Sequence, residues 1–170
     1  SALLTVLIGI LCACVGIFLC VSLHQCGHAY RKVFPNPYIR VLAGSAIFIV
    51  LTLLFPARLY NGSGAQIIEM VFEGERIPVY AFLMKILFTG VALGAGFKGG
   101  EIVPTLAVGS SFGCTFGLLT GFEPSLCAAA GMLATFVGVT NCPIATMFLG
   151  FELFGFEAMP YFAVAVAISF

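Results

Sequence analysis

The amino-terminal run places the strongest constraint on the fold. Residues Ala2 to Leu23 include no charged side chain, and about 20 apolar residues are enough for a helix to cross a bilayer. Over the whole chain, 61% of the residues are hydrophobic and 8% are charged, against roughly 25% charged residues in soluble domains. In lipid the backbone must satisfy its own hydrogen bonds, which favours helices. The sequence therefore predicts an all-α integral membrane protein.

The charge balance and the cysteines exclude other classes. Seven Lys and Arg residues balance seven acidic residues, so the chain has no excess positive charge with which to bind nucleic acid. The seven cysteines are odd in number, show no CxxC pair and lie mostly inside apolar runs. They are interpreted as small core residues rather than as a disulfide framework.

The apolar segments alternate with polar or proline-rich breaks. Several are too short to span a bilayer at 1.5 Å per residue, and such tilted and broken helices are typical of transporters and some channels. We expect one transmembrane domain over residues 1–170, and the uncapped apolar run after Tyr161 predicts that it is a fragment of a larger transport domain. Apolar segments are expected at 2–23, 41–55, 66–72, 79–93, 102–119, 126–139, 144–154 and after 160. Between them we expect a polar connection at 24–40, a break at Pro56 near Arg58, and a charge cluster at the water surface at 73–76.

A glycine-rich stretch precedes one of these segments. Gly94–Gly100 has four glycines and is therefore unsuited to continue a helix. Pro104 follows where the first turn of a helix tolerates a missing N–H, so a helix is expected to begin within two residues of Glu101. The unpaired N–H groups of that turn and the positive end of the helix dipole favour an anion. The sequence predicts an anion site here, lining a protein-enclosed or water-filled cavity.

Two other patterns predict how the helices pack. Gly109, Gly113 and Gly117 recur at every fourth residue, which places three small residues on one helix face and favours close approach of another helix. Lys85 interrupts an apolar run, where a cation costs on the order of 3 kcal/mol. We expect Lys85 to reach the interface, to face an aqueous path or to pair with an acid. Ser63 is expected to cap the short helix that follows it.

Two longer runs carry a family resemblance. Residues 96–113, GFKGGEIVPTLAVGSSFG, have a GG-x-x-x-P loop that opens a helix and a small-residue pattern that follows. Residues 130–153, AGMLATFVGVTNCPIATMFLGFEL, are similar to the next pair of helices, with Pro143 and a buried acid at Glu152. Together these runs resemble the carboxy-terminal half of the CLC family of chloride channels and proton-coupled anion antiporters.

The resemblance implies one half of an inverted-repeat fold with voltage-gated chloride channel-like anion transport. Chloride or another halide would be held by backbone N–H groups of Glu101, Ile102 and Val103, next to Gly99 and Gly100 of the loop. No catalytic residue, cofactor or metal is implied. The expected assembly is a homodimer of multi-pass subunits in the cell membrane, whose partners are membrane lipid and the amino-terminal half of the same chain, which would carry the family's gating residues.

Glu101 bears on the ion that is transported. An acid within GGE-x-x-P is similar to the fluoride/proton antiporter branch, where it is implicated in proton coupling, whereas Val103 departs from the threonine typical of that branch. Glu101 could equally cap its own helix, where a carboxylate is stabilised by roughly 0.3–1 kcal/mol. The sequence leaves open the choice between chloride and fluoride, between channel and antiporter, and between capping and proton transfer.

Three charged or polar features have two interpretations each. Glu152 could be tied to the backbone at the 140–143 break or lie on a proton path, and Lys98 could attract anions or be an ordinary exposed lysine. His24 and His28 share a helix face at i and i+4, with Cys26 between them, which suits zinc in an intramembrane metalloenzyme. The pair lacks the Glu of an HExxH motif.

A purely structural membrane module also fits the composition, but it does not explain the glycine loop.

Overall fold

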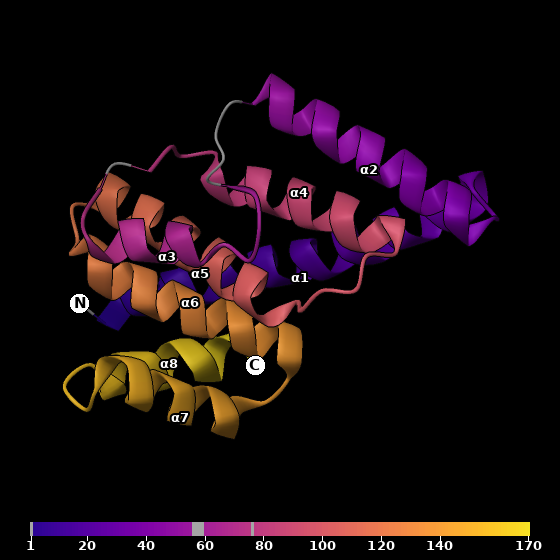
Figure 1. The fold of residues 1–170 in the computed structure, drawn as a ribbon. Helices are drawn as coiled ribbons and strands as arrows, with labels where there is room; N and C mark the ends of the chain where they lie inside the picture. The colour runs from indigo at the N-terminus through magenta and orange to yellow at the C-terminus, as the bar shows by residue number, and fades with distance from the viewer. Residues whose placement is uncertain (1, 56–59, 76) are drawn as a thin grey trace.

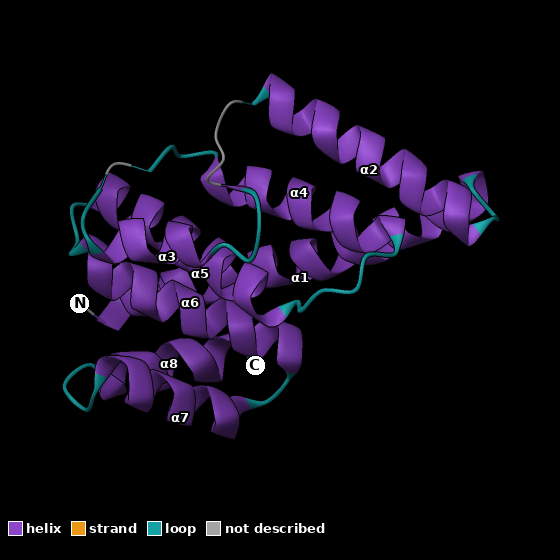
Figure 2. Cartoon of the chain, viewed as in Figure 1, coloured by secondary structure: helices purple, strands orange, loops and turns teal. Residues whose placement is uncertain are grey.

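The computed structural model describes residues 2–55, 60–75 and 77–170. Within these ranges the regular secondary structure is helical and no strand occurs (Figure 2). The predicted all-α fold is therefore confirmed. The helices are α1 (Ala2–Val33), α2 (Pro37–Leu54), α3 (Ala65–Phe72), α4 (Ala81–Ala95), α5 (Ile102–Thr120), α6 (Pro124–Thr140), α7 (Pro143–Phe154) and α8 (Met159–Ser169).

The helices differ in whether their length suffices to cross a bilayer. In the described part of the chain, α1, α2 and α5 are long and apolar enough to do so. Helices α4, α6, α7 and α8 are apolar but have only 10–17 residues. At a rise of 1.5 Å per residue they are shorter than the roughly 30 Å of a hydrocarbon core. The predicted mixture of spanning and shorter helices is confirmed (Figure 1).

The predicted polar connection over residues 24–40 is wrong. Helix α1 continues through its polar residues to Val33, and α2 already begins at Pro37. Polar side chains change what a helix faces but do not prevent its backbone hydrogen bonds, which end only near Pro35, because proline disfavours helical geometry at the residue before it. Pro37 stands in the first turn of α2, where no N–H is needed. Helix α2 is consequently long enough to span a bilayer.

Helix α5 packs against α6 through its glycine face. A Cβ atom added to Gly109 would lie 2.6 Å from the carbonyl oxygen of Gly131, and one added to Gly113 would overlap the carbonyl oxygen of Cys127. Gly117 meets α6 in the same way. Since no real side chain fits at such distances, α6 reaches the backbone of α5. The predicted close packing of this face is confirmed.

The remaining helices surround this pair. Helix α8 packs on α1 and α6, and the Ser169 hydroxyl donates a hydrogen bond of 2.6 Å to the carbonyl oxygen of Ala134. Helix α2 packs on α4, with Gly44 facing Ala95. Figure 1 shows α2 at one edge of the bundle and α7 with α8 at the opposite edge. Because α4 packs on α2 and α5 packs on α6, the loop that joins α4 to α5 lies between two well-packed helices.

Some predictions concern the connections around α3. The break at Pro56 with Arg58, and Arg76 of the charge cluster, lie outside the described residues. Glu73 and Glu75 of that cluster are exposed. The prediction that Ser63 caps α3 is confirmed in part: Gly64, with a φ of 97°, takes the N-cap position, but the Ser63 hydroxyl accepts a long hydrogen bond of 3.5 Å from the N–H of Ala65, the first residue of α3.

Candidate functional site

The glycine loop begins two residues later than predicted. Gly94 and Ala95 still belong to α4. The C-cap residue of this helix is Gly96, whose φ of 100° is a backbone conformation that favours glycine. The missing side chain of Gly94 serves packing instead, since a Cβ there would lie 3.0 Å from the ring of Tyr30 and 3.1 Å from Cys26 on α1. The non-helical stretch therefore runs from Gly96 to Glu101.

The helix start lies where the sequence predicts it. Helix α5 begins at Ile102, with Glu101 as the N-cap residue, and the Thr105 N–H donates to the Glu101 carbonyl at 3.1 Å. In the part of the chain that the structure describes, the N–H groups of Glu101, Ile102 and Val103 have no backbone acceptor. Pro104 has no N–H. Three donors in succession are thus free to bind an external acceptor.

The carboxylate of Glu101 does not cap this helix. Its side chain is exposed, and no side-chain hydrogen bond from the described residues caps α5. Glu101 has helical backbone angles (φ −88°, ψ −15°), whereas a capping residue normally has extended angles that turn its side chain over the first turn. The capping interpretation is therefore wrong in this structure. The role of Glu101 in proton transfer stays a prediction.

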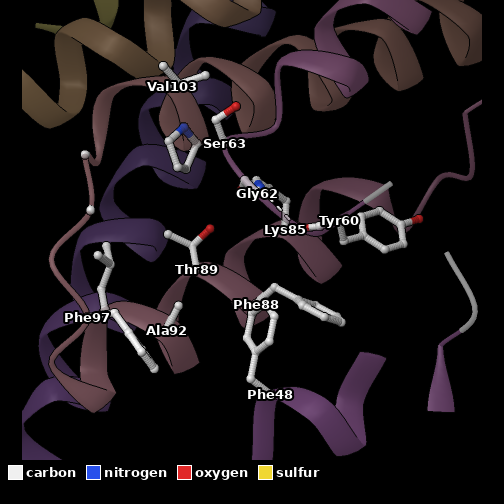
Figure 3. Close-up of a pocket in the computed structure, with 14 residues that line it drawn as sticks. Phe48, Tyr60, Gly62, Ser63, Lys85, Phe88, Thr89, Ala92, Phe97 and Val103 are labelled. Carbon is white, nitrogen blue, oxygen red and sulfur yellow. Dashed lines mark hydrogen bonds between the residues drawn. The ribbon is translucent and has the colours of Figure 1, made fainter. Parts of the chain in front are cut away.

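A cavity of about 440 Å³ adjoins the loop and the first turn of α5. Gly99, Gly100 and Val103 line it, as the predicted site requires, whereas Glu101 and Ile102 do not. The other walls come from α2, α4, the segment before α3 and Phe97 of the loop (Figure 3). These walls carry Phe48, Tyr60, Gly62, Ser63, Lys85, Phe88, Thr89, Ala92, Leu93 and Phe97.

Lys85 is a site residue whose partners the sequence did not reveal. Its side chain is 1% exposed, so it does not reach the interface. Its Nζ donates to the carbonyl oxygens of Gly62 at 2.7 Å and Tyr60 at 3.2 Å, and it lines the cavity (Figure 3). The interruption of an apolar run by a cation was the signal that marked Lys85, but its carbonyl partners lie on a distant segment.

The other candidate residues do not join this site. Lys98 is exposed in the loop and does not line the cavity. His24 and His28 are exposed on α1, whereas the Cys26 sulfur faces Gly90 of α4, 3.2 Å from the position of an added Cβ. Among the described residues no group of three potential metal ligands comes together. The structure therefore gives the histidine pair no third ligand.

Glu152 is not the buried acid that the resemblance implies. It is exposed near the end of α7. Helix α7 begins at Pro143, so the 140–143 break lies more than two helical turns away, and the predicted tie between the Glu152 carboxylate and that backbone is wrong. The physical reason is that α7 lies at the edge of the bundle (Figure 1), where its Ile144 and Phe148 side chains are exposed as well.

Comparison with known proteins shows which family the chain belongs to. A family model described as voltage gated chloride channel matches residues 1–170. The chain belongs to this family, the CLC family. A chloride/fluoride channel protein of Pseudomonas syringae pv. tomato is 30% identical over 100% of the chain and 39% of its own length. An H(+)/Cl(-) exchange transporter of Vibrio cholerae is 32% identical over 66% of the chain and 26% of its own length.

A solved CLC structure shares the fold. The crystal structure of a CLC-type fluoride/proton antiporter matches 99% of the chain with a TM-score of 0.95 and 31% identity, and the match covers 42% of that protein. The predicted CLC-type helical architecture is thereby confirmed. The chain spans about two fifths of the length of the first of these relatives and of this structure.

Proposed function

We propose that this chain forms part of a protein that transports chloride or another halide across the cell membrane. The observation that carries this proposal is the cavity that joins Gly99, Gly100 and Val103 to the buried Lys85. Unpaired N–H groups, the positive end of the α5 dipole, equivalent to about half a charge, and an ammonium group all favour an anion there. The described residues that line the cavity include no acidic side chain.

The cavity suits an ion that must be bound and then released. The N–H donor at Val103, which lines the cavity, is held in place by the helix, so it needs no reorganisation when an anion arrives. Phe48 and Phe88, whose rings lie 5.4 Å apart, form part of the apolar wall and exclude water, which strengthens the attraction. Neutral backbone donors bind an anion without the strong pairing that a cluster of arginines would give, which permits release.

Exchange of fluoride for protons is the second candidate function. It is favoured by the acid at Glu101 and by the likeness to the antiporter structure. Glu101 adjoins Gly100 and precedes Val103 by two residues, and both of these line the cavity, so a change in its side-chain torsions could bring the carboxylate toward a bound anion. Glu101 would then exchange protons in step with anion occupancy.

The assembly is also part of the proposal. Since the chain spans about two fifths of the relatives it matches, we expect the transport protein to include a further half that completes the pathway. Ile144, Phe148 and Phe156 are 73%, 68% and 72% exposed, and side chains of this kind require lipid or protein cover. A homodimer of multi-pass subunits in the cell membrane would provide it.

The test uses the full-length protein in liposomes, with electrodes that record the release of chloride or fluoride and the uptake of protons. We expect anion release well above that of empty liposomes. Glu101→Gln should weaken or abolish proton uptake while anions still bind, because the backbone donors are unchanged. Glu157→Gln makes the same chemical change at an exposed acid outside the cavity and should behave as the unmodified protein.

Each outcome bears on a different part of the proposal. Anion release no faster than from empty liposomes would refute anion transport. An unchanged number of protons taken up per anion in Glu101→Gln would refute the proton-transfer role of Glu101 and would leave anion transport untouched. Preference for fluoride over chloride would favour the antiporter function.

A further inference from the structure

The positive charge of Lys85 has no counter-charge among the described residues. Its side chain is 1% exposed. The ammonium is therefore removed from water, and no described charged group lies close enough to interact with it. The residues outside the described ranges (1, 56–59 and 76) include no Asp or Glu that could pair with it. A buried charge normally persists only when it is paired with an opposite charge.

The hydrogen bonds of Lys85 leave one donor available. An ammonium group has three N–H donors, and two of them are taken by the carbonyl oxygens of Gly62 and Tyr60. These carbonyls are neutral, so they satisfy hydrogen bonds without balancing the charge. Because Lys85 lines the cavity together with Val103, the third donor can serve an ion inside it.

The packing around Gly64 keeps the ammonium in this position. A Cβ atom on Gly64 would lie 2.7 Å from Cε of Lys85 and 2.9 Å from Cβ of Ala107. The lysine stem is therefore enclosed between the segment before α3 and helix α5. The ammonium cannot swing out to bulk water without separating these elements, so its counter-charge has to come into the cavity.

We propose that Lys85 provides a second anion-binding position, in which an ion in the cavity accepts a hydrogen bond from the lysine ammonium and neutralises its buried charge. This inference rests on the proposed anion transport and adds to it a charged side chain that binds the ion beside the backbone donors of α5. Affinity in this cavity then depends on one fixed positive charge as well as on the neutral backbone donors of α5.

The test measures how strongly chloride and fluoride protect the full-length protein from thermal unfolding in detergent. Lys85→Met removes the charge and keeps a long side chain, Lys85→Gln removes the charge but retains a hydrogen-bond donor, and Lys85→Arg keeps the charge. We expect the two neutral variants to need at least tenfold more anion for half-maximal protection and Lys85→Arg to stay close to the unmodified protein. Lys32→Met removes the same charge from the exposed end of α1 and should leave the anion requirement unchanged.

A measurement on the unmodified protein covers the case in which the neutral variants do not fold. In crystals of the full-length protein grown with bromide, anomalous scattering should place an ion within hydrogen-bond distance of Lys85 Nζ. Bromide bound only at the first turn of α5, or a folded Lys85→Gln protein with an unchanged anion requirement, would overturn this inference while leaving anion transport intact. Absence of any anion protection or bromide peak in the unmodified protein would overturn both.

Discussion

The two sides of α5 differ in how closely their neighbours approach. Toward α6, glycines at every fourth position bring the two backbones into contact. Toward α4, the first turn of α5 borders a cavity of about 440 Å³ whose walls carry Lys85 and several phenylalanine rings. The close side holds the helix in place, and the open side leaves its unpaired N–H groups accessible. Side-chain size on the two faces of one helix thus determines which face is closely packed and which borders a cavity.

The largest expected effect comes from breaking the close side. Gly113→Leu should lower the free energy of unfolding of the intact protein by at least about 3 kcal/mol, since its Cβ alone would overlap the backbone of α6 and overpacking against backbone cannot relax cheaply. Thermal unfolding in detergent measures this. Gly27→Ala is the matched control in an open part of α1, where no atom of the described residues lies within 4 Å of the added Cβ, and it should stabilise the protein by about 0.5–1 kcal/mol. A Gly113→Leu protein as stable as the unmodified one would mean that α5 and α6 are not in backbone contact.

A smaller effect is expected on the open side, at the segment that covers Lys85. Gly62→Ala and Gly64→Ala both place a side chain at a positive φ, which costs about 1–2 kcal/mol, but a Cβ has open space at Gly62 and meets Lys85 and Ala107 at Gly64. Gly64→Ala should therefore cost about 1–3 kcal/mol more than Gly62→Ala. The difference between the two unfolding free energies measures how tightly the lysine stem is enclosed. Equal costs would show that the lysine is free to move.

The sequence predicted those features whose causes are local. Glycines and Pro104 determine where α5 begins, and a four-residue spacing suffices to place Gly109, Gly113 and Gly117 on one face. The contacts of Lys85 could not be predicted, because its carbonyl partners lie 23 and 25 residues away along the chain. Gly94 was assigned to the loop because of the glycines around it, and its contact with Tyr30 of α1, still more distant in sequence, could not be predicted.

Two of the wrong predictions have separate physical reasons. Polar composition suggested a connection at 24–40, but a helix tolerates polar residues and ends only where proline interrupts its hydrogen bonding. The resemblance implied a buried acid at Glu152, whereas α7 is an edge helix on which Glu152 is exposed. Local pattern thus predicted the helix start at the candidate site, whereas the cavity beside it depends on contacts between segments far apart in sequence.

The central claim, that backbone N–H groups at the start of α5 hold the anion, is tested most directly by replacing the amide of Val103 with an ester in the full-length protein. This removes one donor and leaves the side chain in place. A hydrogen bond to a charged group contributes about 1.5–3 kcal/mol, so anion binding measured by calorimetry should weaken by roughly tenfold or more. The same replacement at Ile144, in the first turn of α7, should leave binding unchanged. Equal anion affinity of the Val103 ester and the unmodified protein would contradict the claim.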